Sequence, residues 1–163
     1  MESEETGMIS LERADRLAGM IKERLKPYCS KIEIAGSTRR RKPWVKDIDF
    51  VAIPSDLWRL QNEIDSLGPR KVAGPKIMRV MAGEIQIDVY FATVETWGML
   101  FLVKTGSAGN NIRLATLAKR RGWRFAASGD GLFNETGERI AGDTERSIYD
   151  ALGVLWQEPA ERS

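Results

Sequence analysis

The sequence predicts an α+β fold in which a mixed β-sheet with flanking helices is followed by a smaller α+β unit. In the first part of the chain, segments that alternate apolar and polar residues, as strands do, are interleaved with segments of helical periodicity. After Thr93 the pattern changes, and the strand-like segments become shorter. The chain contains neither an internal repeat nor a low-complexity stretch. We therefore expect two domains, residues 1–93 and residues 94–163.

The first domain is expected to begin with a helix that covers a sheet. Apolar residues recur at helical spacing over residues 11–25, Ser10 is a suitable N-cap, and Pro27 ends the run. Residues 31–35 alternate as a strand does and lead into a glycine-serine turn. Residues 47–53 form the second expected strand.

A second amphipathic helix and a β-hairpin complete this domain. Leucine and isoleucine residues mark the helix over residues 55–67, and a glycine-proline pair stops it. Residues 76–80 and 84–91 are expected to pair around a turn at residues 82–83. In the later strand the apolar side chains share one face, so Asp88 lies on the other face.

The second domain is expected to hold three helices and two short strands. The first helix covers residues 94–103, and after a turn rich in small residues the next runs from about residue 110 to residue 121. Residues 123–126 and 131–133 are expected to be the strands. Asp143 is expected to cap the last helix, which a glycine ends.

Composition restricts the chemistry that this chain can perform. Its 163 residues include no histidine and one cysteine, Cys29. Ser-His-Asp catalysis, a histidine base and zinc sites of the usual kinds are therefore excluded, which leaves carboxylates, Lys/Arg and bound metal. No apolar run approaches the ~20 residues that cross a bilayer, and the N-terminus lacks the pattern of a signal peptide. These features predict a cytoplasmic protein that is neither secreted nor membrane-bound.

Two aspartates alternate on the second expected strand. Asp47 and Asp49 should point to one side while Ile48 and Phe50 point into the core. Neighbouring carboxylates repel each other, and a divalent cation relieves that repulsion. Asp88 could supply a third carboxylate beside them. Read singly, an Asp-x-Asp strand is often a charged surface edge and a lone strand aspartate is usually surface decoration, whereas the combination favours a metal-dependent phosphoryl-transfer site.

Two basic segments accompany the carboxylates. Residues 36–46 and residues 113–124 each carry several Lys or Arg residues and no acidic residue, although the net charge of the chain is only +2. A basic run is usually a solvated face. Two such runs beside a carboxylate cluster are instead typical of a nucleic-acid or polyphosphate binder.

Several motifs in this order resemble a known family. Gly36-Ser37, followed by Asp47-Ile48-Asp49 and then Asp88, resembles the nucleotidyltransferase palm. The second half resembles the thumb of family X DNA polymerases through Thr105-Gly106-Ser107, Asn111, Gly131-Leu132-Phe133, the segment 145–153 and the segment 158–162. The resemblance implies a palm domain at residues 1–93, a thumb domain at residues 94–163, and the minimal palm-plus-thumb form of the family.

The resemblance also implies roles for individual residues. Asp47, Asp49 and Asp88 would be the catalytic residues and would bind two Mg²⁺ ions, with Mn²⁺ as a substitute. Asp88 would also be placed to accept the proton of the primer 3′-hydroxyl. The nucleotide would be bound by Gly36, Ser37, Arg40, Lys46, Thr105, Gly106, Ser107 and Asn111. Contacts to DNA would come from Arg113, Lys119, Arg120, Arg121 and Arg124.

One departure from the family concerns the sugar of the incoming nucleotide. The two positions before Thr105 are commonly aromatic in the family and help to exclude ribonucleotides. Here they are Val103 and Lys104. We therefore expect weaker discrimination between dNTPs and rNTPs.

The sequence thus predicts a DNA-directed DNA polymerase that adds dNMP to a primer 3′-hydroxyl and fills short gaps in DNA repair. Its expected partners are a gapped or primer–template duplex and a dNTP, and it is expected to act as a monomer, without a membrane. Two alternatives remain open. One is a template-independent or small-molecule nucleotidyltransferase, and the other is a non-catalytic nucleic-acid-binding module of the same fold.

Overall fold

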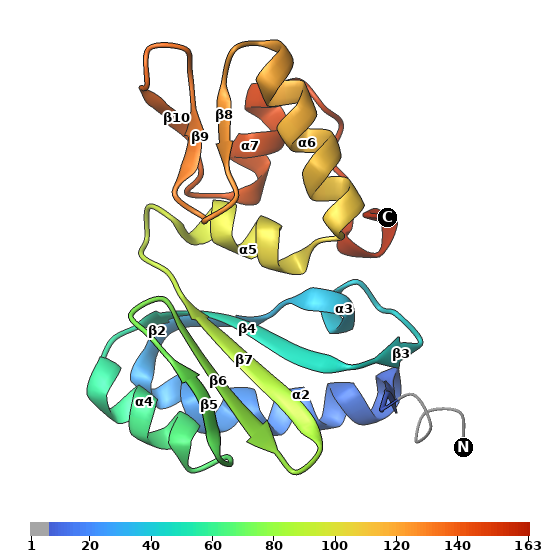
Figure 1. Cartoon of the computed structure of the whole chain (residues 1–163), viewed down its shortest axis with the longest axis vertical. Coiled ribbons are helices and arrows are strands. Elements are labelled where there is room, and N and C mark those ends of the chain that lie inside the picture. The colour runs from blue at the N-terminus through green and yellow to red at the C-terminus, as the bar shows by residue number, and fades with distance from the viewer. Residues whose placement is uncertain (1–6) are drawn as a thin grey trace. The chain divides into compact units, whose positions relative to one another are not determined.

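The computed structural model describes residues 7–163 of the chain (Figure 1). The backbone contacts divide the chain into unit 1, Met1–Phe91, and unit 2, Ala92–Ser163. Each unit has its own buried apolar cluster. No helix among residues 7–163 is both long enough and apolar enough to cross a membrane.

Unit 1 is built on a five-stranded mixed sheet with the strand order β2-β4-β7-β6-β5. Strands β4 and β7 run parallel, and every other neighbouring pair is antiparallel. The sheet is therefore mixed, as predicted. The strands are β2 (Cys29–Ile34), β4 (Asp47–Pro54), β5 (Arg70–Ala73), β6 (Ile77–Ala82) and β7 (Ile85–Phe91).

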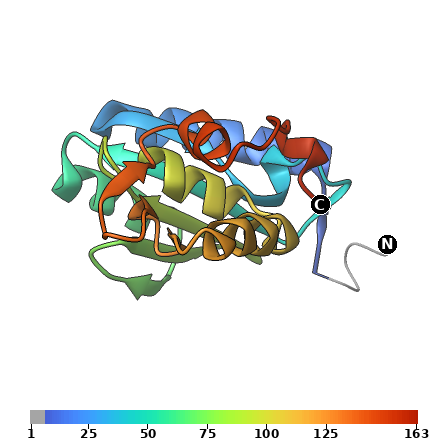
Figure 2. The same ribbon diagram turned by 90° about the horizontal axis from the view of Figure 1, so that it is seen from above.

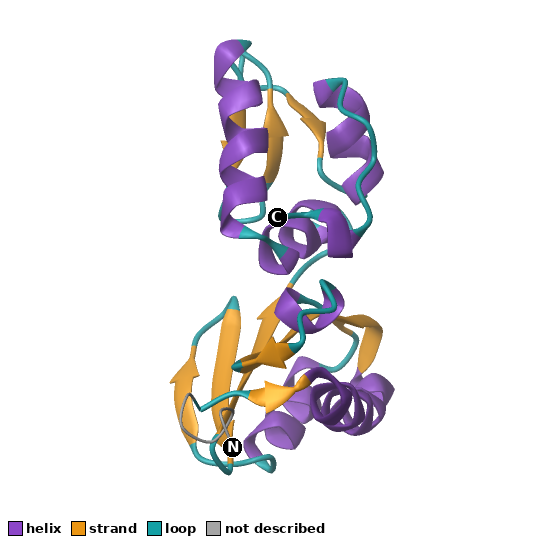
Figure 3. Cartoon of the chain, turned by 90° about the vertical axis from the view of Figure 1, so that its right-hand side faces the viewer, coloured by secondary structure: helices purple, strands orange, loops and turns teal. Residues whose placement is uncertain are grey.

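Two helices, α2 (Leu11–Leu25) and α4 (Leu57–Asp65), cover one face of this sheet, as Figure 3 shows from the side. Ser10 caps α2, since its side chain accepts a hydrogen bond from the Arg13 amide at 3.2 Å. The predicted cap is thus confirmed. A short 3-10 turn, Lys26–Tyr28, with its proline follows α2 and turns the chain into β2.

The core of unit 1 lies between these helices and the sheet. Ile48 and Phe50 of β4 and Ile87 and Val89 of β7 are fully buried there, together with the apolar faces of α2 and α4. Each such side chain contributes about 1.5–3 kcal/mol when it leaves water. Because β4 and β7 bury alternate residues on this side, their remaining side chains must emerge on the opposite face of the sheet.

Four short elements of unit 1 differ from the sequence-based expectation. The chain after β2 forms a single helical turn, α3 (Gly36–Arg39), where only a turn was expected. Strands β1 (Ile9–Ser10) and β3 (Trp44–Val45) pair with each other over two residues each. Strand β5 was not predicted, because all of its residues are exposed and show no apolar alternation. The backbone hydrogen bonds of β5 to β6 stabilise it as a strand.

Unit 2 packs three helices against a small antiparallel sheet with the order β10-β9-β8, and Figure 2 shows the same helices from above, coloured yellow to red. The elements are α5 (Trp97–Thr105), α6 (Ala108–Arg120), β8 (Arg124–Ala126), β9 (Gly131–Phe133), β10 (Arg139–Ala141), α7 (Glu145–Leu152) and the 3-10 turn η2 (Pro159–Glu161). Strand β10 was not predicted, since it is three residues long and mostly exposed.

The helix ends of unit 2 correct two expectations. Thr144, and not Asp143, caps α7, because its Oγ1 accepts a hydrogen bond from the Ser147 amide at 3.0 Å. Helix α6 begins at Ala108 instead of about residue 110, because the side chain of Ser107 accepts a hydrogen bond from the Asn110 amide at 3.1 Å. Both caps belong to the strongly preferred Ser/Thr class.

The C-terminal tail is bound to α7 by a buried ion pair. The side chain of Arg162 is fully buried and donates to the Glu145 carboxylate at 2.7 Å. Its guanidinium also lies over the rings of Tyr149 and Trp156, at 5.5 and 4.9 Å from their centroids. The sequence alone does not predict this ordered tail. The partner of Arg162 is seventeen residues away, and no local sequence pattern indicates that the two residues pair.

Candidate active site

The carboxylates of the predicted site lie on the sheet face opposite the helices α2 and α4. Ile48 and Phe50 point into the core, so Asp47 and Asp49 point away from it. In the parallel pairing of β4 with β7, Asp49 stands directly opposite Asp88. The three aspartates therefore share one face of two neighbouring strands.

Asp88 is the most enclosed of the three carboxylates. Its side chain is only 4% exposed. Arg79, which stands opposite it on β6, donates from Nε to Oδ1 at 2.7 Å and from Nη2 to Oδ2 at 3.2 Å. Gln86 Nε2 and the Tyr90 hydroxyl also donate to Oδ2, at 3.2 and 3.4 Å. The carboxylate is thus held by donors from three side chains.

The electrostatics of this face follow from its crowded negative charge. Burial, and then the charge of Asp88, raise the pKa of Asp47, while Lys46 and Arg79 oppose the rise. Burial and the charges of Asp88 and Asp49 raise the pKa of Tyr90 far above its ordinary value. Tyr90 therefore remains a protonated donor at neutral pH. A face that disfavours further negative charge in this way favours a cation.

The helical turn α3 approaches Asp49 closely. Gly36 has φ = 63°, and a Cβ at this position would collide with the Asp49 carboxylate. Both facts require glycine here. The amide of Ala35 also donates to the carbonyl of Asp49 at 2.8 Å, which fixes the turn against β4. Arg40 follows the turn, and its pKa is lowered by burial, although the charge of Asp49 opposes this shift.

The side chains on this face are of the type that suits a divalent cation. Carboxylate oxygens on adjacent strands are the hard donors that Mg²⁺ and Mn²⁺ prefer. In their present orientations, no three acidic, histidine or cysteine side chains among residues 7–163 are grouped closely enough to hold a metal ion. Both oxygens of Asp88 carry donors from Arg79 instead. The donor type and placement fit such a cation, provided that Asp88 is released from Arg79 or shared with it.

The predicted nucleotide-binding residues of unit 2 lie at the junction of α5 and α6. Thr105 is fully buried, and Gly106 has φ = 74°. Ser107 caps α6 through its side chain. Asn111 donates from Nδ2 to the Val103 carbonyl at 2.9 Å. The junction is thus a fixed turn, and the Asn111 amide nitrogen is engaged within it.

The predicted DNA-binding residues divide into two groups. Three of them have structural contacts: Arg113 donates to Asn110 at 2.6 Å, Arg121 donates to the Ala151 and Leu152 carbonyls at 2.8 and 2.7 Å, and Arg124 lies over the Phe133 ring.

Lys119 and Arg120 form the second group. Both are exposed on the last turn of α6. The other three residues are exposed as well, but their contacts within unit 2 hold them, so this pair is the more readily available source of positive charge for a phosphate backbone.

Arg79 is the site residue that the sequence motifs did not indicate. The predicted hairpin did not reveal it, because the predicted turn at residues 82–83 would pair residue 79 with residue 86. In the structure the turn lies at residues 83–84, which pairs Ala82 with Ile85 and, three steps further, Arg79 with Asp88. The predicted turn was therefore wrong by one residue, and the correct register is what places an arginine beside the third carboxylate.

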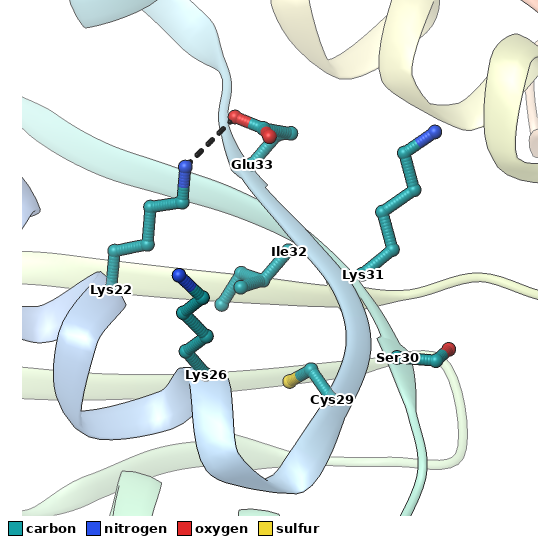
Figure 4. Close-up of a pocket in the computed structure, with 7 residues that line it drawn as sticks. All are labelled: Lys22, Lys26, Cys29, Ser30, Lys31, Ile32 and Glu33. Carbon is teal, nitrogen blue, oxygen red and sulfur yellow. Dashed lines mark hydrogen bonds and ion pairs between the residues drawn. The ribbon is translucent and has the colours of Figure 1, made fainter.

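A separate pocket of about 260 Å³ lies between α2 and the edge strand β2 (Figure 4). Lys22, Lys26, Lys31 and Cys29 contribute to its lining, and Lys22 forms an ion pair with Glu33 at 3.1 Å. Burial raises the pKa of the Cys29 thiol to about 11, so the thiol is not a nucleophile at neutral pH. None of the predicted site residues lines this pocket.

Comparison with known proteins finds similar sequences and similar folds. Residues 100–163 match the family model of the DNA polymerase beta thumb. The chain is 29% identical over 147 residues to the DNA polymerase/3′-5′ exonuclease PolX of Bacillus subtilis (strain 168). That match covers 85% of this chain and 26% of the relative, so the chain spans about a quarter of the length of this curated relative.

Two solved structures of Leishmania infantum polymerase beta have the same fold. They are ternary complexes described as primer–template and gap complexes, with TM-scores of 0.82 and 0.81 and identities of 18% and 16%. Each covers 96% of this chain, and the matches cover 77% and 71% of the two solved chains. The structural matches show that the chain has the polymerase beta fold, and the thumb match and the PolX match show its similarity to family X DNA polymerases.

Proposed function

We propose that this chain is a nucleotidyltransferase that adds dNMP to the 3′-hydroxyl of a primer on DNA, and that it fills short gaps in repair as a monomer. One observation carries the proposal: Asp49 and Asp88 stand opposite each other on β4 and β7, and Asp47 shares their face. Three buried or half-buried carboxylates on one face repel one another, which favours a bound cation.

The chemistry is an in-line displacement at the α-phosphorus of a dNTP. A bond forms from the 3′-oxygen to this phosphorus, the bond to the bridging oxygen of the leaving pyrophosphate breaks, and the hydroxyl proton goes to a base. Bound Mg²⁺ or Mn²⁺, as two ions held by Asp47, Asp49 and Asp88, would neutralise the charge that develops on the attacking and leaving oxygens.

The remaining roles belong to groups around α3 and the junction of α5 and α6. In unit 1, the Gly36-Ser37 turn offers donors to the triphosphate, and Arg40 binds its outer phosphates, with Lys46 as a further contact. In unit 2, we assign the turn at residues 105–107 to the sugar and Asn111 to the base edge. The rigid glycine turn beside Asp49 supports the first assignment, because it lets the backbone approach a carboxylate without a side chain between them.

A primer-extension assay on three substrates tests this function. The substrates are a gapped duplex, a blunt single strand and no DNA, each with one dNTP at a time and with Mg²⁺ or Mn²⁺. We expect incorporation on the gapped duplex that depends on the template base. Equal incorporation on the single strand would indicate the template-independent alternative. DNA binding without incorporation under either metal would indicate a binding module and would contradict the proposal.

Val103 and Lys104 lead to a prediction about sugar selection. We expect the ratio of dNTP to rNTP incorporation to be lower than in relatives with an aromatic pair before the same turn, because neither side chain offers a flat bulky wall. Single-turnover rates with dCTP and CTP opposite the same template base measure this ratio. A ratio as large as that of aromatic-bearing relatives would show that another group excludes the 2′-hydroxyl.

Lys119 and Arg120 lead to a prediction about DNA binding. We expect the double variant Lys119→Ala/Arg120→Ala to bind duplex DNA more weakly, and the slope of log K against log salt to fall by about 2, roughly one for each phosphate that the variant no longer neutralises. Fluorescence anisotropy over a series of salt concentrations measures the slope. Lys71→Ala on β5 is the control and should leave it unchanged. An unchanged slope in the double variant would remove this part of α6 from the DNA interface.

A further inference from the structure

We propose that Arg79 is a positioning residue that holds the Asp88 carboxylate while no divalent cation is bound, and that a cation binds the site by taking Asp88 from Arg79. This inference rests on the proposed function, since it concerns the same carboxylates. It adds a competition between a side chain of the protein and the cation. Arg79 has no part in the roles described above.

Two negatively charged residues and one positively charged residue lie in a row across three neighbouring strands of the sheet. Asp49 on β4, Asp88 on β7 and Arg79 on β6 are directly opposite one another. The guanidinium of Arg79 binds Asp88 as a fork, with one nitrogen to each carboxylate oxygen. Such paired charge-assisted hydrogen bonds fix a carboxylate in orientation as well as in charge. Asp88 is therefore directed toward β6.

Burial makes a positive partner necessary for Asp88. An ionised carboxylate that is only 4% exposed requires a partner of opposite charge. Gln86 and Tyr90 donate hydrogen bonds to it but carry no positive charge. Arg79 is the cation that meets this requirement in the structure. Without Arg79, the Asp88 carboxylate would bind another cation from solution.

The two partners of this ion pair differ in exposure. The side chain of Arg79 is 34% exposed, whereas that of Asp88 is enclosed. Arg79 can therefore turn into water when the pair separates, while the Asp88 carboxylate remains enclosed and able to turn to the cation. A divalent cation needs at least one of the oxygens that Arg79 now occupies, and the two positive charges repel each other. Binding of the cation and release of Arg79 are thus coupled.

A direct metal-binding measurement tests the inference without any turnover. Free Mn²⁺ is followed by electron paramagnetic resonance at one mildly alkaline pH with wild type, Arg79→Met and the control Arg70→Met. Arg70 also binds an aspartate through its fork, but on the exposed strand β5. We expect Arg79→Met to bind Mn²⁺ about 10-fold more tightly, or ~1.4 kcal/mol, and Arg70→Met to match wild type. Equal or weaker binding by Arg79→Met would overturn the inference.

Thermal unfolding supplies a second readout. Without metal, Arg79→Met should melt below wild type, and added Mn²⁺ should raise its melting temperature by more than it raises that of wild type. If the variant does not fold without metal, it is purified in Mn²⁺. The double variant Arg79→Met/Asp88→Asn lacks the unpaired carboxylate, so it should fold and should not show the higher affinity. A double variant that binds as tightly as Arg79→Met would contradict a role through Asp88.

The same titrations separate this inference from the proposed function. If wild type binds Mn²⁺ and extends primers while Arg79→Met binds no more tightly, the competition is wrong and the enzyme assignment stands. If neither protein binds Mn²⁺, with or without a dNTP, both the competition and the metal site are wrong.

Discussion

Asp49→Asn and Asp88→Asn each lower single-turnover nucleotide incorporation on a gapped duplex by about 1,000-fold or more, which is the upper range for the loss of one preorganised charge-stabilising group. Asparagine has the shape of aspartate, but its amide does not carry the negative charge that holds a divalent cation. Gly36 lies close against the Asp49 carboxylate, and Asp88 stands opposite Asp49 in the register of the parallel pair, so both positions belong to the carboxylate site.

Asp65→Asn is the matched control. Asp65 also pairs with an arginine in unit 1, but the pair is exposed and lies at the end of α4. Its incorporation rate should stay within about threefold of wild type, as expected for an exposed ion pair. Circular dichroism would confirm that the variants fold. Near-normal turnover by Asp49→Asn or by Asp88→Asn would refute the carboxylate site.

Arg162→Met and Glu145→Gln each lower the free energy of unfolding of unit 2 by about 3–5 kcal/mol, because each leaves one buried charge without its partner. Arg162 is fully buried, and Glu145 is 8% exposed. Arg162 also packs on Tyr149 and Trp156, so its replacement removes packing on these rings as well. Hydrogen exchange of the α7 amides in increasing urea reports this free energy for unit 2 alone.

Two further variants separate the ion pair from general damage. The double variant Glu145→Gln/Arg162→Met should be destabilised by less than the sum of the two single effects, since no unpaired charge remains. Arg16→Met breaks an exposed pair with Glu12 on α2 and should change the stability of unit 1 by less than about 0.5 kcal/mol. Strict additivity of the two single effects would show that the pair contributes nothing as a pair.

The parts of the site that follow from local patterns were predictable from the sequence. Alternation on β4 separated Asp47 and Asp49 from Ile48 and Phe50, and burial in the structure follows that division. The alternation along β7 likewise placed Asp88 on the opposite face from its apolar neighbours. In each case one strand carries both the core side chains and the site side chains, so the alternation of apolar and acidic residues along that strand predicts both sets.

The parts that depend on distant partners were not predictable in this way. Strand β5 has no apolar face of its own and is held by hydrogen bonds to β6. Arg162 can be buried because it forms an ion pair with Glu145, and the sequence around neither residue indicates this pairing. Arg79 resembles any surface residue of a strand until the register places it on Asp88. Long-range pairing decides all three.

The proposed metal site can be observed by anomalous diffraction from a crystal grown with Mn²⁺ and a non-hydrolysable dNTP analogue. We predict a manganese peak within bonding distance of oxygens of Asp49 and Asp47, with Asp88 turned to it and the Arg79 guanidinium moved from its fork. A manganese peak bound elsewhere, with Asp88 still held by Arg79, would contradict both the carboxylate site and the competition for Asp88.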